Sequence, residues 1–214
     1  MKDLSVLIIE DHPLITEAYE LYTLDFDENA KIRMAADIKT AEHLINNYEF
    51  DLAFCDVQLG ISNSENVQTG VELAELLKAR NAGVKIIIGT SIDDMYLIMG
   101  IKERVDPDAL LIKNDYRGRD LKAIITAIMN NEKFYSITVT KLITKRDQFT
   151  DQYMLELKHF NLLLCMKFGY SNIKLEHTFN ISNKTVLNWK NKIADAFDVS
   201  IKDIVEEAQR LQYI

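Results

Sequence analysis

Five polar side chains end apolar runs in the first half of the sequence, where their types permit phosphoryl chemistry. They are Glu10 and Asp11 after VLII, Asp56 after DLAFC, Thr90 after KIIIG and Lys113 after ALLI. Three crowded carboxylates repel one another, and a hard divalent cation such as Mg²⁺ relieves that repulsion through oxygen ligands. One carboxylate can then accept a phosphoryl group whose oxygens a lysine and a hydroxyl neutralise. The residue types indicate a magnesium-assisted phosphoryl-acceptor site.

Each of these residues has an ordinary explanation when it is taken alone. Asp11 can cap a helix that begins at Pro13, and Thr90 can cap the helix after it. A lone Lys113 is usually a solvated charge. What favours the site is the coincidence of acids, hydroxyl and lysine, each at the end of a different strand-like run.

The elements that must position these side chains are short strands alternating with helices. Apolar runs predict strands over 4–9, 31–35, 51–55, 84–89 and 108–112. Amphipathic spacing predicts helices near 13–25, 37–48, 70–82, 92–104 and 117–131. Five consecutive strand–helix units predict an α/β domain with a doubly wound, five-stranded parallel sheet. The carboxyl ends of such strands share one edge, so the five polar side chains should meet there.

The first 131 residues resemble a response-regulator receiver domain. VLIIEDHP, DLAFCDVQLG, KIIIGTS and ALLIKND follow the motifs of that family in order and spacing. The resemblance implies a flavodoxin-like strand order and phosphorylation of Asp56 by a histidine kinase. It implies that Mg²⁺ is held by Glu10, Asp11, Asp56 and the backbone carbonyl of Gln58. It also implies that the phosphoryl group is sensed by Thr90 and Lys113.

Two features depart from the receiver pattern. The loop GISNSENVQT, over 60–69, is about six residues longer than usual, and the family's glycine is matched by Gly70. The inserted loop is a candidate lid or partner-binding segment, or it is simply tolerated, because loop extension costs little. Leu110 stands where the family usually has an aromatic switch residue, and leucine has no polar tip to move between water and core. We therefore expect the phosphoryl signal to leave the site by another route.

The rest of the chain predicts a linker and a small all-α domain. We place the receiver domain at 1–131, the linker at 132–150 and the helical output domain at 151–214. Helical patterns cover about 152–167, 172–179, 183–197 and 200–212. Residues 1–150 carry 17 Lys or Arg and 25 Asp or Glu, whereas residues 151–214 carry 8 of each. This asymmetry indicates separate roles for the two parts.

The segment 170–198 has the pattern of a helix-turn-helix. A short helix, a tight connection at 180–182 and a longer helix follow one another, and the second helix of such a motif enters the DNA major groove. The inward face of the longer helix, 183–197, is predicted to contain Val186, Trp189, Ile193 and Phe197. Its outer face supplies the candidate DNA contacts Lys184, Thr185, Leu187, Asn188, Asn191 and Lys192.

Residues 155–212 resemble a NarL/LuxR-type output domain through the run GYSNIKLEHTFNISNKTVLNW. The resemblance implies DNA binding by the 183–197 helix and dimerisation through the last helix, near 200–212. Leu187 and Asn191 depart from it, since the family often has lysines there. The chain is thus predicted to be a two-component response regulator that is phosphorylated on Asp56, dimerises and regulates transcription. The alternative is a phospho-switched protein-interaction module that does not bind DNA.

Other protein classes fit the sequence less well. Cys55 and Cys165 cannot form a disulfide framework, and the longest apolar runs fall far short of the roughly 20 residues that span a bilayer. We expect a cytoplasmic protein without a membrane partner. It is not expected to be an enzyme, because Gln58 stands where a phosphohydrolase would have a second acid. The histidines show no metal-binding spacing and are expected to be helix or surface residues: His12, His43, His159 and His177.

Overall fold

The computed structural model describes residues 3–59 and 70–214, so the loop expected at 60–69 lies outside the described residues. The chain divides into two compact units. The first comprises the described residues up to 93 together with 100–139, and the second comprises 94–99 and 140–214.

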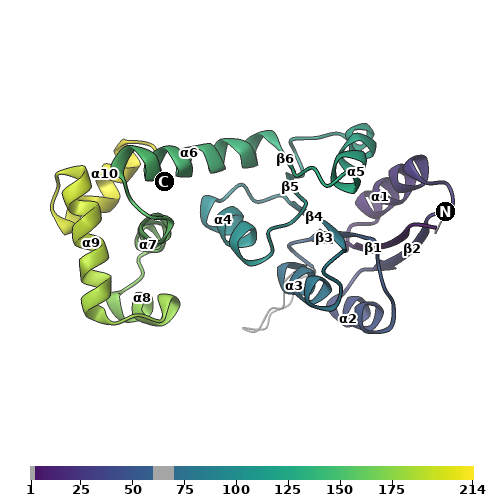
Figure 1. Ribbon diagram of the computed structural model, residues 1–214, viewed down its shortest axis with the longest axis horizontal. Coiled ribbons are helices and arrows are strands. Elements are labelled where there is room, and N and C mark those ends of the chain that lie inside the picture. Colours follow the sequence, from purple (N-terminus) through teal and green to yellow (C-terminus); the bar gives the residue numbers. More distant parts are fainter. Residues whose placement is uncertain (1–2, 60–69) are drawn as a thin grey trace. The chain divides into compact units, whose positions relative to one another are not determined.

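The first unit is built on a parallel sheet with the strand order β2-β1-β3-β4-β5-β6 (Figure 1). The strands are β1 (Ser5–Ile9), β2 (Lys31–Ala35), β3 (Leu52–Asp56), β4 (Lys85–Thr90), β5 (Ala109–Ile112) and β6 (Phe134–Tyr135). All five pairings between neighbouring strands are parallel. The doubly wound sheet expected from the sequence, with its flavodoxin-like order, is confirmed.

The sheet has six strands instead of the five expected. β6 joins the edge at β5, where the Phe134 amide donates to the Asp108 carbonyl at 2.9 Å and the Ser136 amide to the Leu110 carbonyl at 3.1 Å. A two-residue strand is too short to show an alternating or continuous apolar pattern. Only its hydrogen bonds to β5, more than twenty residues earlier, identify it.

Helices cover both faces of the sheet in Figure 1, with α1 and α5 on one face and α2 and α3 on the other. The helices of this part of the sequence are α1 (Pro13–Phe26), α2 (Ile38–Asn47), α3 (Gly70–Arg80), α4 (Met95–Arg104) and α5 (Leu121–Met129), the last preceded by the 3₁₀ turn η1 (Gly118–Asp120). Between the sheet and the α1–α5 face lies a core cluster that includes Val6, Ile8, Phe54, Leu111 and Ile125. Neighbouring Leu7 and Ile9 are also fully buried, on the opposite face. Burial on both faces explains why these strands are apolar nearly throughout.

The second unit is entirely helical within its described residues. Its elements are residues 95–99 of α4, most of α6 (Ile137–Tyr153), then α7 (Leu157–Lys167), α8 (Asn172–Phe179), α9 (Asn183–Phe197), the 3₁₀ turn η2 (Ile201–Asp203) and α10 (Ile204–Arg210). Among residues 3–59 and 70–214, each helix is too short or too polar to cross a lipid bilayer.

The segment 132–150, expected to be a linker, contains β6 and most of α6. Phe149 of α6 is fully buried. Its ring packs edge-on against Phe160, Phe197 and Tyr213, with centroid distances of 5.1, 5.8 and 5.2 Å. Aromatic contacts of this kind make α6 part of the core of the second unit.

Candidate functional site

The carboxyl ends of β1, β3, β4 and β5 meet at one edge of the sheet, because parallel strands share a direction. Asp56, the last residue of β3, pairs in register with Gly89 of β4, and Lys113 directly follows β5. Figure 1 shows these strands side by side in the centre of the sheet. We define the acidic rim as Glu10, Asp11, Asp56 and Lys113.

Lys113 joins two acids of the acidic rim. Its Nζ lies 2.8 Å from Glu10 Oε2 and 3.1 Å from Asp56 Oδ2. The Glu10 side chain is fully buried, and the side chains of Asp56 and Lys113 are only 4% and 11% exposed. Charges this deep are tolerated only when they are paired, so the lysine and the two carboxylates hold one another in place.

The pKa values of these groups reflect burial and mutual charge. Burial, and then the charge of Glu10, raises the pKa of Asp56 above its ordinary 3.8, although Lys113 opposes the shift. Burial by itself lowers the pKa of Lys113, but the hydrogen bond to Glu10 and the charge of Asp56 outweigh it, so the pKa is raised overall. Both burial and the neighbouring carboxylate disfavour a charged Asp56, and a cation at the acidic rim would favour it.

His12 lies beside the acidic rim, which sequence spacing did not reveal. Its Nδ1 is 2.9 Å from both Glu10 Oε1 and Asp11 Oδ1. The hydrogen bond to Glu10, followed by the charge of Asp11, raises the pKa of His12. Ligand atoms of Glu10, Asp11, His12 and Asp56 all lie within 4.8 Å of one another. His12 is exposed just before α1, as expected of a surface residue, but its approach to two acids of the rim was not foreseen.

The carboxylate oxygens of this cluster are the ligands that Mg²⁺ prefers, so the residues present fit that ion. Gln58 is exposed, and its backbone amide hydrogen-bonds to the Asp56 carboxylate. The role of the Gln58 carbonyl as a ligand stays a prediction. Thr90 is fully buried at the end of β4, where its Oγ1 accepts a hydrogen bond from the Ile92 amide at 3.1 Å. Its phosphoryl-sensing role also stays a prediction.

Two glycines near the acidic rim are closely packed, and Gly70 lies directly against the backbone of Asp56. A Cβ at Gly70 would lie 1.6 Å from the backbone oxygen of Asp56, so only glycine fits at the start of α3. A Cβ at Gly89 would lie 3.0 Å from the Tyr19 hydroxyl and 3.6 Å from Lys113 Cε. The contact with the Tyr19 hydroxyl is tight, whereas that with the lysine stem is an ordinary van der Waals contact.

Two tyrosines, Tyr19 buried and Tyr116 half-buried, pair through their hydroxyls. The hydroxyls of Tyr19 and Tyr116 are 3.0 Å apart, and the Tyr19 ring stacks on Phe54 with centroids 4.5 Å apart. Burial raises the pKa of Tyr19 well above its ordinary value. The two residues are 97 positions apart in the sequence, so no local pattern pairs them.

The second unit contains the helix-turn-helix expected at 170–198. Ser171 caps α8 and Ser182 caps α9, each accepting a hydrogen bond from the amide three residues later, at 3.3 Å. Between the helices Asn180 adopts a left-handed conformation with φ of 50°, which ends α8 and turns the chain. These local signals explain why both helix boundaries could be predicted.

The candidate DNA contacts lie along one side of α9. Five of them are exposed: Lys184, Leu187, Asn188, Asn191 and Lys192. Thr185 is half-buried, and its hydroxyl lies 3.0 Å from that of Ser182, so it also belongs to the cap. We define the α9 face as these six residues. Their contact with DNA stays a prediction.

The opposite side of α9 packs inward as predicted. Val186, Ile193 and Phe197 are buried. Trp189 is half-buried and meets the rings of His159 and Phe179 edge-on, at 5.9 and 5.7 Å. Trp189 therefore packs inward as predicted, but at the edge of the core instead of inside it.

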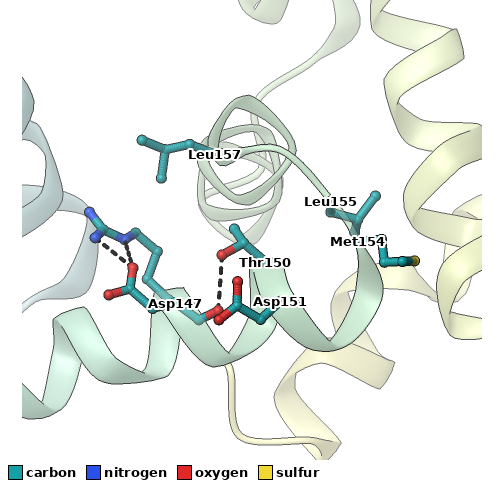
Figure 2. A pocket seen from close by; sticks show the side chains of 7 residues that line it. Asp147, Thr150, Asp151, Met154, Leu155 and Leu157 are labelled. Carbon is teal, nitrogen blue, oxygen red and sulfur yellow. Dashed lines mark hydrogen bonds and ion pairs between the residues drawn. The ribbon is translucent and has the colours of Figure 1, made fainter.

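A separate hollow of about 490 Å³ lies against α6 and the start of α7 in the second unit (Figure 2). Figure 2 shows Asp147, Thr150 and Asp151 from α6 on one side, and Met154, Leu155 and Leu157 beyond the end of that helix. The Arg146 guanidinium is held by Asp147, and the Thr150 hydroxyl donates to the Asp147 carbonyl at 2.9 Å. These polar groups are satisfied within α6, and the hollow shares no residue with the acidic rim or the α9 face.

The part of the chain that contains the acidic rim is similar to known proteins. Residues 6–112 match the family model of the response regulator receiver domain. The transcriptional regulatory protein MalR of Bacillus subtilis (strain 168) is 26% identical over 95 residues, which cover 44% of this chain and 38% of MalR. The match thus spans well under half of that relative.

Solved structures of RcsB are similar to this chain over nearly its whole length. The RcsB response regulator of Salmonella typhimurium gives a TM-score of 0.58 at 17% identity, covering 99% of this chain and all of that one. A structure of two RcsB dimers bound to two parallel DNAs gives a TM-score of 0.61 at 17% identity, covering 97% and 98%. Identities this low show a shared fold.

Proposed function

This chain belongs to the response regulator receiver family, and from that premise we propose that it is a phosphorylation-controlled transcriptional regulator. A histidine kinase supplies the phosphoryl group, Asp56 accepts it, and the α9 face binds DNA. The observation that carries the proposal is the pairing of Lys113 with both Glu10 and Asp56, three residues from three different strand ends.

The phosphoryl transfer follows from the chemistry of the acidic rim. A carboxylate oxygen of Asp56 forms a bond to phosphorus while the bond from phosphorus to the donor's histidine nitrogen breaks, and that nitrogen keeps the electron pair. Glu10, Asp11 and Asp56, with the Gln58 carbonyl, would hold Mg²⁺, which neutralises charge on the phosphoryl oxygens. The buried pair with Glu10 keeps the Lys113 ammonium within reach of the group added to Asp56.

DNA binding by the second unit is supported by the local geometry of α9. Lys184 and Lys192 are exposed on the α9 face and can contact phosphates, which supply much of the affinity for DNA. Asn188 and Asn191 are exposed on the same face and can pair with adenine edges. RcsB, the structural neighbour described above, has been solved on DNA. Dimerisation upon phosphorylation is part of the same proposal.

The experiment that tests the phosphoryl site compares Asp56, at the end of β3, with Asp51, which directly precedes the strand. The wild-type chain and Asp51→Asn should take up phosphoryl from a small phosphodonor with Mg²⁺, whereas Asp56→Asn should not. Asp51 lies at the opposite end of the strand, where it accepts a hydrogen bond from the Ser5 amide at 2.9 Å. Uptake by Asp56→Asn equal to wild type would overturn the assignment.

The DNA half of the proposal is tested by selection from a genomic pool, with the protein free and with beryllofluoride and Mg²⁺. We expect a sequence motif that is bound more tightly in the beryllofluoride form and more weakly as salt increases. Absence of enrichment in both forms at low salt would overturn DNA binding. It would favour a protein-interaction module, for which the exposed Leu187 would be a contact.

A further inference from the structure

A network of hydrogen bonds joins the turn that bears Lys113 to the first turn of α6. Asp115, two residues after Lys113, accepts a hydrogen bond from the Ser136 hydroxyl at 2.6 Å. Its carboxylate also accepts from the backbone amide and the hydroxyl of Thr138, at 2.7 and 2.9 Å. All of these residues belong to the first unit, so the network does not depend on how the two units are placed.

Asp115 takes over a role that the residue before a helix usually fills. Ser136 directly precedes α6, and a serine there normally accepts a hydrogen bond from the second or third helical amide. Here the amide of Thr138, the second helical residue, donates to Asp115 instead. The Ser136 hydroxyl is buried, donates to Asp115 and accepts from the Ile112 amide at 3.1 Å. Asp115 therefore caps α6 from another segment, and Ser136 ties that cap to β5.

The electrostatics of a helix start make this cap strong. The first amides of a helix lack partners within the helix, and the positive end of the helix dipole lies there. A carboxylate placed at that end forms charge-assisted hydrogen bonds, which are stronger than neutral ones. The Asp115 amide also donates to the Ile112 carbonyl at 2.9 Å, which closes the turn around Lys113. The turn and the helix start are thus held as one structure.

We propose that Asp115 is a positioning residue that couples the phosphoryl state of Asp56, sensed by Lys113, to the first turn of α6. The inference rests on the proposed function. A phosphoryl group on Asp56 gives the Lys113 ammonium a new partner, and a shift of the lysine backbone is passed through Asp115 to Thr138. Leu110 cannot act as a polar switch, so this network is the route by which the signal leaves the site. α6 begins in the first unit and continues into the second, which makes its first turn a suitable receiver of the signal.

The test measures amide hydrogen exchange over residues 137–141 in the full chain, with and without beryllofluoride and Mg²⁺. In the wild type we expect beryllofluoride to change these exchange rates at least threefold. In Asp115→Ala the same amides should exchange at least tenfold faster without beryllofluoride and no longer respond to it. Binding of beryllofluoride, followed by ¹⁹F NMR, should persist in this variant, because Asp115 is not one of the residues that form the acidic rim. Asp115→Asn keeps one acceptor for the Thr138 amide and should restore part of the response. This variant takes the place of Asp115→Ala in the measurement if Asp115→Ala does not fold.

The matched control is Asp37→Ala, because Asp37 caps α2 with the same chemistry. Its carboxylate accepts from the amide and the hydroxyl of Thr40, at 2.9 and 2.7 Å. This variant should lose protection at the start of α2 and keep the full response at α6. A response at α6 that is the same in Asp115→Ala as in the wild type would overturn the coupling. A wild type that binds beryllofluoride without any change at α6 would also overturn it and leave the proposed function intact. No beryllofluoride binding by the wild type would overturn the proposed function and this inference with it.

Discussion

The acidic rim and the α9 face are both built from side chains that the sequence singles out, but the two regions hold those side chains differently. In the acidic rim, Lys113 is paired with two buried acids from other strands. On the α9 face, Lys184 and Lys192 are exposed, and their positions follow from helix periodicity alone. The rim is therefore part of the folding core as well as the proposed reaction site, whereas the exposed α9 face is expected to contribute little to stability.

The largest effect should come from replacing the glycine that packs on Asp56. Gly70→Ala should lower the free energy of unfolding of the first unit by about 4 kcal/mol or more, because the new Cβ meets the Asp56 carbonyl oxygen at 1.6 Å. Beryllofluoride binding should be lost with it. Urea unfolding monitored by hydrogen exchange of the sheet amides measures this.

The matched control is Gly100→Ala in α4, where an added Cβ would meet no atom of the described residues within 4 Å. Alanine favours helix over glycine by up to about 1 kcal/mol, so this variant should be unchanged or more stable. Equal destabilisation by both substitutions would contradict the close approach of α3 to Asp56.

Removing the rim lysine should have the next largest effect. Lys113→Met leaves Glu10 and Asp56 buried without their cation and should cost about 3 kcal/mol at neutral pH. Mg²⁺ should restore part of the loss, because it replaces the missing positive charge. Urea unfolding with and without Mg²⁺ measures both. In the control Lys122→Met, the lost partner is Asp25 at 3.1 Å on the surface, and the cost should stay within about 1 kcal/mol and be insensitive to Mg²⁺. If the Lys113 variant lost as little stability as this control, the pairing of Lys113 with Glu10 and Asp56 would not stabilise the fold.

A smaller effect, dependent on pH, is expected inside the second unit. His159 Nδ1 accepts a hydrogen bond from the Glu156 amide at 3.0 Å, and no described residue hydrogen-bonds to its buried Nε2. Burial lowers the pKa of His159 below 6.5, and Lys158 and Lys192 lower it further against the opposing charge of Glu156. The unfolded chain therefore binds this proton more readily than the folded one. Stability from neutral His159 is present above pH 6.5 and is lost as the pH falls from there through the lowered pKa.

Unfolding followed by Trp189 fluorescence, between pH 8 and pH 5, tests this expectation. His159→Gln keeps an acceptor for the Glu156 amide without a titrating ring, so it should lose less stability over this range than the wild type does. Parallel pH profiles for the two proteins would show that His159 does not set the acid sensitivity of the second unit.

The smallest effect on stability is expected on the α9 face. Lys184→Ala and Lys192→Ala should each change the free energy of unfolding by less than about 0.5 kcal/mol, because both side chains are exposed. If each lysine contacts one phosphate, the slope of log affinity for DNA against log salt should fall by about 1 per substitution. Lys141→Ala, an exposed lysine of α6, should leave that slope unchanged. Filter binding at several salt concentrations measures the slopes. Equal slopes for all three variants would show that Lys184 and Lys192 do not contact DNA phosphates.

The sequence by itself was enough to predict those features of the fold that depend on neighbouring residues. The strands near the rim were predictable because burial on both faces requires continuous apolar runs, as in the segment that ends at Asp56. The bounds of α8 and α9 were predictable because Ser171 and Ser182 are N-caps. The meeting of Asp56 and Lys113 followed because parallel strands place their carboxyl ends along one edge.

Only the tertiary structure decided which distant residues complete these features. The two-residue β6, the hydroxyl pair of Tyr19 and Tyr116, and the cap of Asp115 on α6 join segments that lie 21 to 97 positions apart. No periodicity or local propensity encodes such pairs, because a hydrogen bond between distant segments depends on where the whole sheet brings them. The residues of the rim can therefore be picked out from the sequence, but the hydrogen bonds that join the turn after Lys113 to α6 appear only in the folded chain.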